Sequence, residues 1–321
     1  MTIPDAITAE APRMDPEKFK DPHLTAKGER RASVALTHLR TLWFNTGSLC
    51  NITCHNCYID SSPTNDRLAY LSAAEVRRYL DEVDREGYAV EEIAFTGGEP
   101  FMNKDLPTML AEALGRGYRV LVLTNAMKPM WHRREILKAL NRNHAAELAF
   151  RVSIDHHTPK KHEAIRGDGT WTPMIKGIRW LATESFKLTV AGRTCWDETE
   201  ADARDGYRRL FAVEGIPVDV DDPAALVLFP EMDTNVDVPE ITVNCWDLLG
   251  VEPEMMMCAT SRMVIKRRAA ESPAVVPCTL LPYDHEFELG AELAGSRKTV
   301  RLNHPHCAQF CVLGGASCSP D

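Results

Sequence analysis

The chain has 321 residues, a formal net charge of −9 and a hydrophobic fraction of 44%. This length and apolar content suit one large domain, alone or with a small appendage. The negative charge argues against non-specific binding to nucleic acid or to a membrane surface. No apolar run approaches the length of a membrane span, and the N-terminus lacks the apolar core of a signal peptide. We therefore expect a cytoplasmic protein without membrane or nucleic-acid partners.

Residues 1–39 are rich in proline, lysine and glutamate and show little apolar periodicity. They predict an irregular N-terminal arm, in which we find no leader-peptide-binding module. The apolar run Leu42-Trp43-Phe44 follows and predicts the first buried strand.

Three cysteines come next, in the stretch Cys50-Asn51-Ile52-Thr53-Cys54-His55-Asn56-Cys57. Spaced three and then two residues apart in a loop, they can converge on one centre. Thiolates favour soft metals, and iron–sulfur clusters are normally held by cysteine. A loop that offers three thiolates leaves one iron of a four-iron cluster open to another ligand. The alternative is a zinc knuckle, but a structural zinc site needs four protein ligands and no fourth follows at finger spacing.

Beyond the loop, strand and helix patterns alternate about six times. Ser72 and Glu75 form a capping box at the start of a helix that Gly87 ends. The patterns predict strands at 92–95, 119–123, 148–154, 188–194 and 226–229, and helices at 105–114, 133–140, 172–183 and 198–213. Such alternation implies a parallel sheet covered by helices. A closed eight-fold barrel needs roughly 250 residues, so we predict an α/β fold with a partial (β/α)6 parallel barrel over residues 40–232.

Polar residues follow several of these strands. The strand at 92–95 runs into Gly97-Gly98-Glu99-Pro100, in which the glycines admit a ligand close to the backbone and the proline fixes the exit. Thr124-Asn125, Ser153 with Asp155, and Arg193 stand at the ends of later strands. In parallel α/β folds this end of the sheet carries the chemistry.

Together, the C-x3-C-x2-C loop and the Gly97–Pro100 turn resemble the radical S-adenosylmethionine (SAM) enzymes, which carry the two motifs in this order and at this separation. The resemblance covers residues 42–232. It implies a [4Fe-4S] cluster held by Cys50, Cys54 and Cys57, with SAM at the open iron. It also implies reductive cleavage of SAM to a 5′-deoxyadenosyl radical, which takes hydrogen from a substrate. An electron donor such as flavodoxin or ferredoxin would be a partner.

The resemblance and these positions together predict the cofactor-binding residues Tyr58, Gly97, Gly98, Glu99, Asn125, Ser153, Asp155 and Arg193. Tyr58 matches the family position whose backbone meets the adenine, and a packed aromatic is the alternative. Asn125 could instead begin a turn. Ser153 and Asp155 share one face of their strand and look like ribose or substrate ligands. Arg193 could pair with the methionine carboxylate through its bidentate fork, although relatives vary here.

Arg166-Gly167 resembles an Arg-Gly element found in many relatives, and a plain surface turn explains it nearly as well. No catalytic residue can be assigned from the sequence. Cys195 is better explained as a small buried hydrophobic residue than as a ligand.

A second group of cysteines lies in the C-terminal part of the chain. Residues 264–268 and 273–278 predict a two-stranded hairpin with a cysteine on either side. This resembles the twitch half of the SPASM extension, in which such a hairpin and a later cysteine pair hold an auxiliary cluster. Two departures are the replacement of the usual turn glycine by Ser272-Pro273 and the presence of another cysteine beyond the final pair.

We choose Cys258, Cys278, Cys307 and Cys311 as ligands of an auxiliary [4Fe-4S] cluster, with Cys318 as the main competitor for the last place. The alternatives are unconnected buried thiols and a zinc site, which four thiolates suit equally well. The auxiliary cluster would accept an electron from the substrate radical or bind the substrate. We therefore expect a small cysteine-rich C-terminal extension over residues 233–321.

The substrate cannot be identified from the sequence. Twitch-type relatives act on small molecules, whereas full SPASM relatives often modify peptides, so the short extension favours a small molecule. A different class of protein, a non-catalytic iron–sulfur or zinc carrier or sensor, is the second hypothesis. Intact Gly97–Pro100 and Asn125 argue against it, because a carrier needs no SAM pocket.

Overall fold

The computed structural model describes residues 12–315, so Cys318 lies outside the described residues. An eight-stranded sheet forms its centre. In spatial order its strands are β7 (Leu226–Phe229), β6 (Lys187–Arg193), β5 (Leu148–Ser153), β4 (Arg119–Thr124), β3 (Glu92–Thr96), β2 (Thr41–Asn45), β8 (Ser261–Ile265) and β9 (Ala274–Val276). Neighbours from β7 to β8 are parallel, and β8 and β9 are antiparallel. The predicted α/β partial barrel is confirmed.

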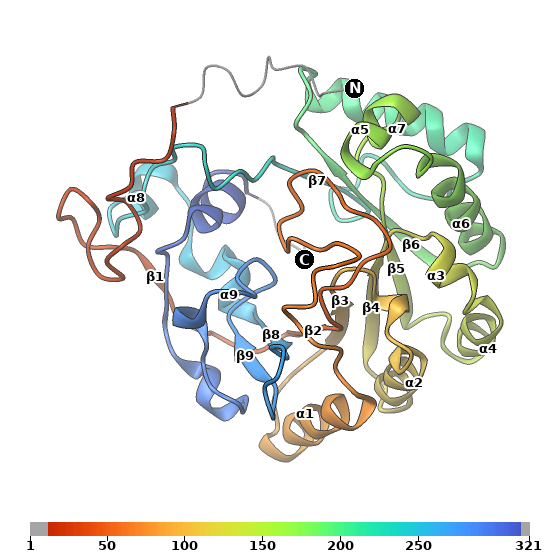
Figure 1. Cartoon of the computed structure of the whole chain (residues 1–321), viewed down its shortest axis with the longest axis horizontal. Helices are drawn as coiled ribbons and strands as arrows, with labels where there is room; N and C mark the ends of the chain where they lie inside the picture. The colour runs from red at the N-terminus through yellow and green to blue at the C-terminus, as the bar shows by residue number, and fades with distance from the viewer. Residues whose placement is uncertain (1–11, 316–321) are drawn as a thin grey trace.

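The helices are α1 (Ala73–Glu86), α2 (Leu106–Gly115), α3 (Lys128–Trp131), α4 (Arg134–His144), α5 (Pro159–Arg166), α6 (Trp171–Thr183), α7 (Glu200–Glu214), α8 (Cys245–Leu249) and α9 (Met257–Thr260). Figure 1 shows α1, α2, α4, α6 and α7 around the outer side of the sheet. The capping box of α1 is present, since Ser72 Oγ accepts from the Glu75 amide and the Glu75 carboxylate accepts from the Ser72 amide. The sequence patterns did not predict the short helices α3 and α5.

Successive strand residues alternate between two hydrophobic cores, as the two-residue period of a strand requires. On β2, Leu42 and Phe44 belong to the core beneath the helices, whereas Trp43 belongs to the core on the inner face. The inner core also contains Cys258, Cys278 and many side chains of the C-terminal segment. The C-terminal segment therefore packs into the inner face of the partial barrel.

The predicted C-terminal hairpin is present as β8 and β9, and it extends the barrel sheet. β8 pairs in parallel with β2, in a register that sets Thr41 opposite Ser261. The N-terminal segment joins the C-terminal one through β1 (Ser33–Val34), which pairs with β10 (Val300–Arg301). Both segments lie on the same side of the molecule in Figure 1. A division of the chain at residues 39 and 232 stays a prediction.

The turn after β3 packs against the backbone that leads into the cysteine loop. The Gly98 amide donates to Gly47 O at 2.9 Å, and the Glu99 amide donates to Leu49 O at 3.2 Å. A Cβ atom on Gly98 would lie 2.2 Å from Leu49 O, and Gly97 has a φ of +144°. From the sequence we expected these glycines to admit a ligand. In the structure, the close approach that requires Gly98 is to the protein's own backbone.

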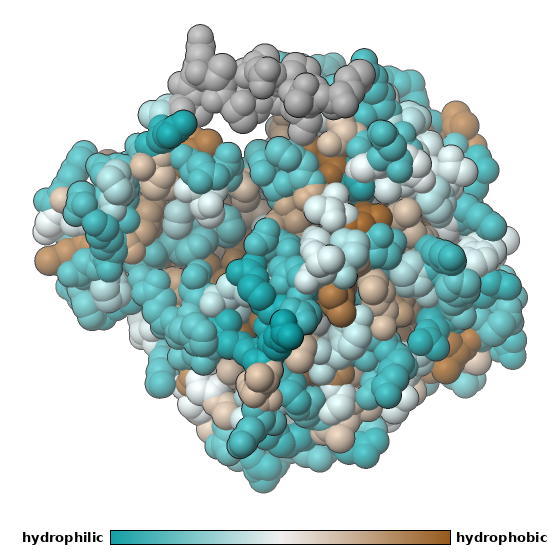
Figure 2. Space-filling view, viewed as in Figure 1, coloured by the Kyte–Doolittle hydropathy of each residue, from teal (hydrophilic) through white to brown (hydrophobic). Residues whose placement is uncertain are grey.

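Among the described residues, no helix combines the length and apolarity needed to cross a bilayer. Hydrophilic residues dominate the face in Figure 2, and hydrophobic ones occur in small groups. The most exposed large hydrophobic side chains are Leu248, Val213 and Met255, which lie on or beside different helices. Exposed hydrophobic surface is thus distributed over several elements.

Replacing Gly98 by Ala should destabilise the protein by about 1–3 kcal/mol, because the added methyl group is forced against a backbone carbonyl. Thermal unfolding of the purified variant measures the effect. Gly115→Ala is the matched control, since a Cβ atom there would meet nothing within 4 Å. The control should unfold at or slightly above the wild-type temperature. Equal unfolding temperatures for both variants would contradict the tight contact at Gly98.

Candidate functional site

A cavity opens at the carboxyl ends of the parallel strands. All three cysteines of the loop line it, and so do six of the predicted cofactor-binding residues: Tyr58, Gly97, Gly98, Asn125, Ser153 and Arg193. The other two, Glu99 and Asp155, are not among its lining residues. The sequence prediction that these strand ends meet at one site is therefore supported by the geometry, and the binding roles stay predictions.

The cysteine loop is held by its non-cysteine residues. The His55 amide donates to Ile165 O at 2.7 Å at the end of α5, and Asn56 Nδ2 donates to Glu231 Oε1 at 2.6 Å. Arg193 donates to the carbonyl groups of His55 and Asn56 at 3.3 and 3.2 Å. These contacts fix the path of the loop and leave its thiols facing the cavity.

The thiols of the loop suit a metal centre with one open position. Burial raises the pKa of Cys50 to about 12 and also raises that of Cys54, where nearby Arg166 opposes the shift. Metal binding must therefore displace thiol protons, as thiolate ligation generally requires. No fourth cysteine and no histidine occurs among the described residues that line the cavity. A structural zinc site would need such a ligand, whereas a four-iron cluster with one open iron would not.

Glu99 lies behind the cavity wall and joins the ends of two strands. Its carboxylate accepts hydrogen bonds from Thr124 Oγ1 and from the Asn125 amide, both at 2.9 Å, and from the Phe101 amide at 3.2 Å. Burial raises the pKa of Glu99 to about 7, and these hydrogen bonds oppose the shift. The carboxylate thus couples the turn after β3 to the end of β4.

Asn125 connects the end of β4 to the cysteine loop. Its Nδ2 donates to Asn51 Oδ1 at 2.9 Å and lies 4.0 Å from Cys50 Sγ, while its Oδ1 accepts from the Met127 amide. The residue therefore does start a turn, which was the alternative explanation of its sequence position. It lines the cavity at the same time.

Asp155 holds two arginines that face the cavity. Arg166 Nε donates to its carboxylate at 2.6 Å, and Arg193 Nε lies 3.6 Å from it. Burial opposes ionisation of Asp155, but the two guanidinium groups hold the pKa of its carboxyl below the usual range. From the sequence we expected Asp155 itself to touch cofactor or substrate. The structure puts Arg166 and Arg193 at the cavity instead, with Asp155 behind them.

Arg166 is the site residue that the sequence prediction left out. It ends α5, a short helix that the sequence patterns did not predict, and an Arg-Gly pair is equally typical of a surface turn. Its resemblance to a family element was the one signal that could have included it. Thr124, which was weighed only together with Asn125, also lines the cavity.

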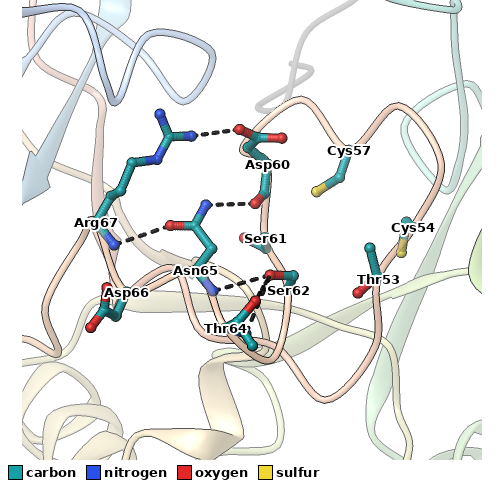
Figure 3. A pocket seen from close by; sticks show the side chains of 10 residues that line it. All are labelled: Thr53, Cys54, Cys57, Asp60, Ser61, Ser62, Thr64, Asn65, Asp66 and Arg67. Carbon is teal, nitrogen blue, oxygen red and sulfur yellow. Dashed lines mark hydrogen bonds and ion pairs between the residues drawn. The ribbon is translucent and has the colours of Figure 1, made fainter.

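Two further pockets border the cysteine loop. Figure 3 shows one of them, with the Cys54 and Cys57 thiols on one side and a polar segment, residues 60–67, on the other. Within that segment Asp60 pairs with Arg67 at 2.6 Å. The other pocket, about 400 Å³, also contains Cys54 and Cys57 and extends to C-terminal residues that include Asp284 and His304. Cys54 and Cys57 therefore line the cavity at the strand ends and both of these pockets.

Four of the C-terminal cysteines meet at a small apolar cavity. Cys258, Cys278, Cys307 and Cys311 all line it, together with Met256, Met257, Pro277, Leu280, Leu281, Val300 and Leu302. Burial raises the pKa of Cys258 to about 11 and that of Cys307 to about 12. No disulfide joins any of the nine described cysteines. Convergence of four thiols fits a tetrathiolate metal site, and the competing ligand Cys318 lies outside the described residues.

Known proteins share parts of this chain. A 143-residue stretch is 27% identical to the antilisterial bacteriocin subtilosin biosynthesis protein AlbA of Bacillus subtilis, covering 44% of this chain and 30% of that protein. A 145-residue stretch is 35% identical to the Fe-coproporphyrin III synthase of Methanosarcina barkeri, covering 45% of this chain and 34% of that protein. The matched part is thus about a third of the length of these curated relatives.

Solved structures share the fold. Streptococcus suis SuiB bound to SAM superposes with a TM-score of 0.58 at 13% identity, covering 79% of this chain and 64% of SuiB. The protein anSMEcpe with bound SAM superposes with a TM-score of 0.55 at 14% sequence identity, and the match covers 81% of this chain and 80% of anSMEcpe. At such identities the likeness concerns the fold alone. The family model of the radical SAM superfamily matches residues 44–210, which is more than half of the sequence and includes the cysteine loop. On that match the chain belongs to the radical SAM superfamily.

Proposed function

We propose that this protein is an enzyme that binds a [4Fe-4S] cluster through Cys50, Cys54 and Cys57 and cleaves SAM reductively. The observation that carries the proposal is one cavity in which three thiols meet the turn after β3 and Asn125, without a fourth cysteine or histidine among its described lining residues. When bound, the cluster supplies the electron that cleaves SAM to a 5′-deoxyadenosyl radical, which takes hydrogen from the substrate.

The protein's own contribution is to bind and orient the cofactor. Arg166 and Arg193 present two guanidinium groups to the cavity, and Arg suits bidentate pairing with a carboxylate such as that of methionine. Asp155 fixes both arginines before the cofactor arrives. Tyr58 and Ser153 line the same cavity and are proposed to contact the rest of SAM.

We further propose that Cys258, Cys278, Cys307 and Cys311 hold an auxiliary [4Fe-4S] cluster in a twitch-like segment. Their convergence on one apolar cavity supports this site. As electron acceptor, the auxiliary cluster would make the net reaction an oxidation, and direct binding of the substrate is the alternative role. Zinc remains the competing occupant because four thiolates suit it as well.

The pocket of about 400 Å³ beside Cys54 and Cys57 is our candidate substrate site. Its volume falls within the range of small-molecule sites, roughly 300–1,000 Å³, which supports a small-molecule substrate. A peptide is the alternative, because the name of AlbA describes bacteriocin biosynthesis and SuiB has been solved with a precursor peptide. We expect a flavodoxin or ferredoxin as electron donor and a cytoplasmic location. The second candidate function is a non-catalytic metal carrier or sensor, which would not need Asn125 and the turn after β3 beside its thiols.

Replacing Cys50, Cys54 and Cys57 together by Ala should remove one cluster and all SAM cleavage, because the open-iron site loses its ligands. The measurement is 5′-deoxyadenosine by chromatography after anaerobic reconstitution with SAM and dithionite. Cys195→Ala is the control, since Cys195 does not line the cavity. Wild-type levels of 5′-deoxyadenosine from the triple variant would refute the proposed function.

Replacing Glu99 by Ala should leave the cluster spectrum intact and weaken SAM binding at least about tenfold, or ~1.4 kcal/mol. The variant leaves the Thr124 hydroxyl and the Asn125 amide without their buried acceptor, which loosens the cofactor side of the cavity. Equilibrium binding of SAM to the reconstituted protein measures the loss. Glu99→Gln keeps one acceptor oxygen and should lose less. Loss of iron from Glu99→Ala would show that the residue supports the cluster instead.

With the three loop cysteines replaced, the protein should still bind about four irons and an equal amount of sulfide at the C-terminal site. Removing Cys258 or Cys278 as well should abolish this residual cluster and destabilise the C-terminal segment. Cys245→Ala, outside the cysteine cavity, is the control. Replacing Cys318 should have little effect if Cys311 is the fourth ligand. Zinc without sulfide would indicate a structural site and exclude the electron-acceptor role.

A further inference from the structure

A buried arginine without a carboxylate partner lies beside the C-terminal cysteines. Arg262, on β8, is fully buried. Its Nε donates to Ser296 O at 2.8 Å, and its Nη1 donates to Cys258 O and Ser261 O, both at 2.7 Å. Its Nη2 has no hydrogen-bond partner among the described residues. Carbonyl dipoles therefore solvate this cation, but no described carboxylate neutralises it.

Another buried arginine shows how this protein ordinarily neutralises such a charge. Arg31 is also fully buried, and it pairs with Glu240 at 2.5 Å. Burying a cation without a counter-ion is unfavourable. Since no described carboxylate pairs with Arg262, its counter-ion must be another anionic group.

The C-terminal thiols are the anionic groups available to Arg262. Arginine keeps its charge at neutral pH in proteins. A hydrogen bond to the backbone carbonyl of Cys258 places the guanidinium of Arg262 beside that residue. Apart from the four sulfurs, the cavity wall consists of aliphatic side chains and methionines. A centre with four thiolates and a doubly positive core would carry two negative charges in this apolar setting, where they too need compensation.

We infer that Arg262 is the counter-ion of the auxiliary centre and raises the reduction potential of the cluster bound there. The inference rests on the proposed auxiliary [4Fe-4S] site. Net charge and hydrogen bonding around a cluster set its potential, and reduction adds one more negative charge. A fixed cation in a low-dielectric interior stabilises that added charge. Arg262 would thereby make the cluster a better electron acceptor, which is the role that an oxidative reaction requires.

The test uses the full-length chain with Cys50, Cys54 and Cys57 replaced by Ala, so that only the C-terminal cluster contributes. After anaerobic reconstitution and counting of iron and sulfide, redox titration gives the midpoint potential. Arg262→Gln should shift it to a more negative value and increase iron loss to a chelator about tenfold. Arg262→Lys keeps the charge and should shift it less. An unchanged potential in Arg262→Gln would overturn the inference.

Thermal unfolding of loaded and metal-free protein separates charge balance from a structural role. Arg262→Gln loses the hydrogen bonds to Ser296, Cys258 and Ser261 in the loaded and in the metal-free protein alike. Their loss lowers the unfolding temperature of both forms. The loaded variant should therefore lose more thermal stability than the metal-free one. Equal losses would overturn the inference. Arg262→Met is a second neutral variant, and failure of both neutral variants to fold without metal would also overturn it.

Failure of the auxiliary site itself is recognisable in the metal analysis. Zinc without sulfide would refute the iron–sulfur assignment and, with it, the claim about the reduction potential. Absence of any metal would refute both proposals. A sulfide-containing cluster whose reduction potential is the same with and without Arg262 would refute the inference alone and leave the proposal of an auxiliary cluster intact.

Discussion

Strand β2 pairs in parallel with β3 on one side and with β8 on the other, and both cysteine-rich sites depend on this pairing. The end of β2 leads into the loop of Cys50–Cys57, and the turn after β3 packs on that connection. β8 directly follows the helix that carries Cys258 and brings it to the inner face of the barrel. Because Trp43 of β2 belongs to the same inner core as Cys258, folding of the barrel and formation of the C-terminal site are coupled.

Electrostatics distinguishes the two sites. At the strand ends, Arg166 pairs with the buried carboxylate of Asp155. Arg193 lies 3.6 Å from Asp155 and 3.3 Å from Glu231, so two carboxylates hold the two arginines. At the C-terminal site, Arg262 shares no described carboxylate, and the thiols are the acidic groups that remain. The first site thus fixes its arginines with carboxylates, whereas the second leaves its arginine without one, which suits the proposed anionic centre.

Local sequence patterns predicted much of this structure because they are set within a few residues. The capping box of Ser72, the cysteine spacings and the glycine turn all need neighbours only. The pairing of β8 with β2, the position of Asp155 behind its arginines and the Gly98–Leu49 contact join residues far apart in the chain. A single sequence carries no direct signal for such contacts. The burial of Arg262 was not predicted either, because Arg262 precedes the predicted hairpin strand at 264–268 and arginine is mostly exposed in proteins.

The pocket proposed for the substrate touches residues of both sites. Cys54, Cys57 and Tyr58 line it and also line the cofactor cavity, while Leu280 lines it and also lines the cysteine cavity of the C-terminal segment. A molecule in this pocket would lie beside the proposed SAM site at one end and beside the proposed auxiliary site at the other. Such an arrangement suits removal of a hydrogen atom followed by removal of an electron. A carrier or sensor would not need a pocket that is shared between the two sites.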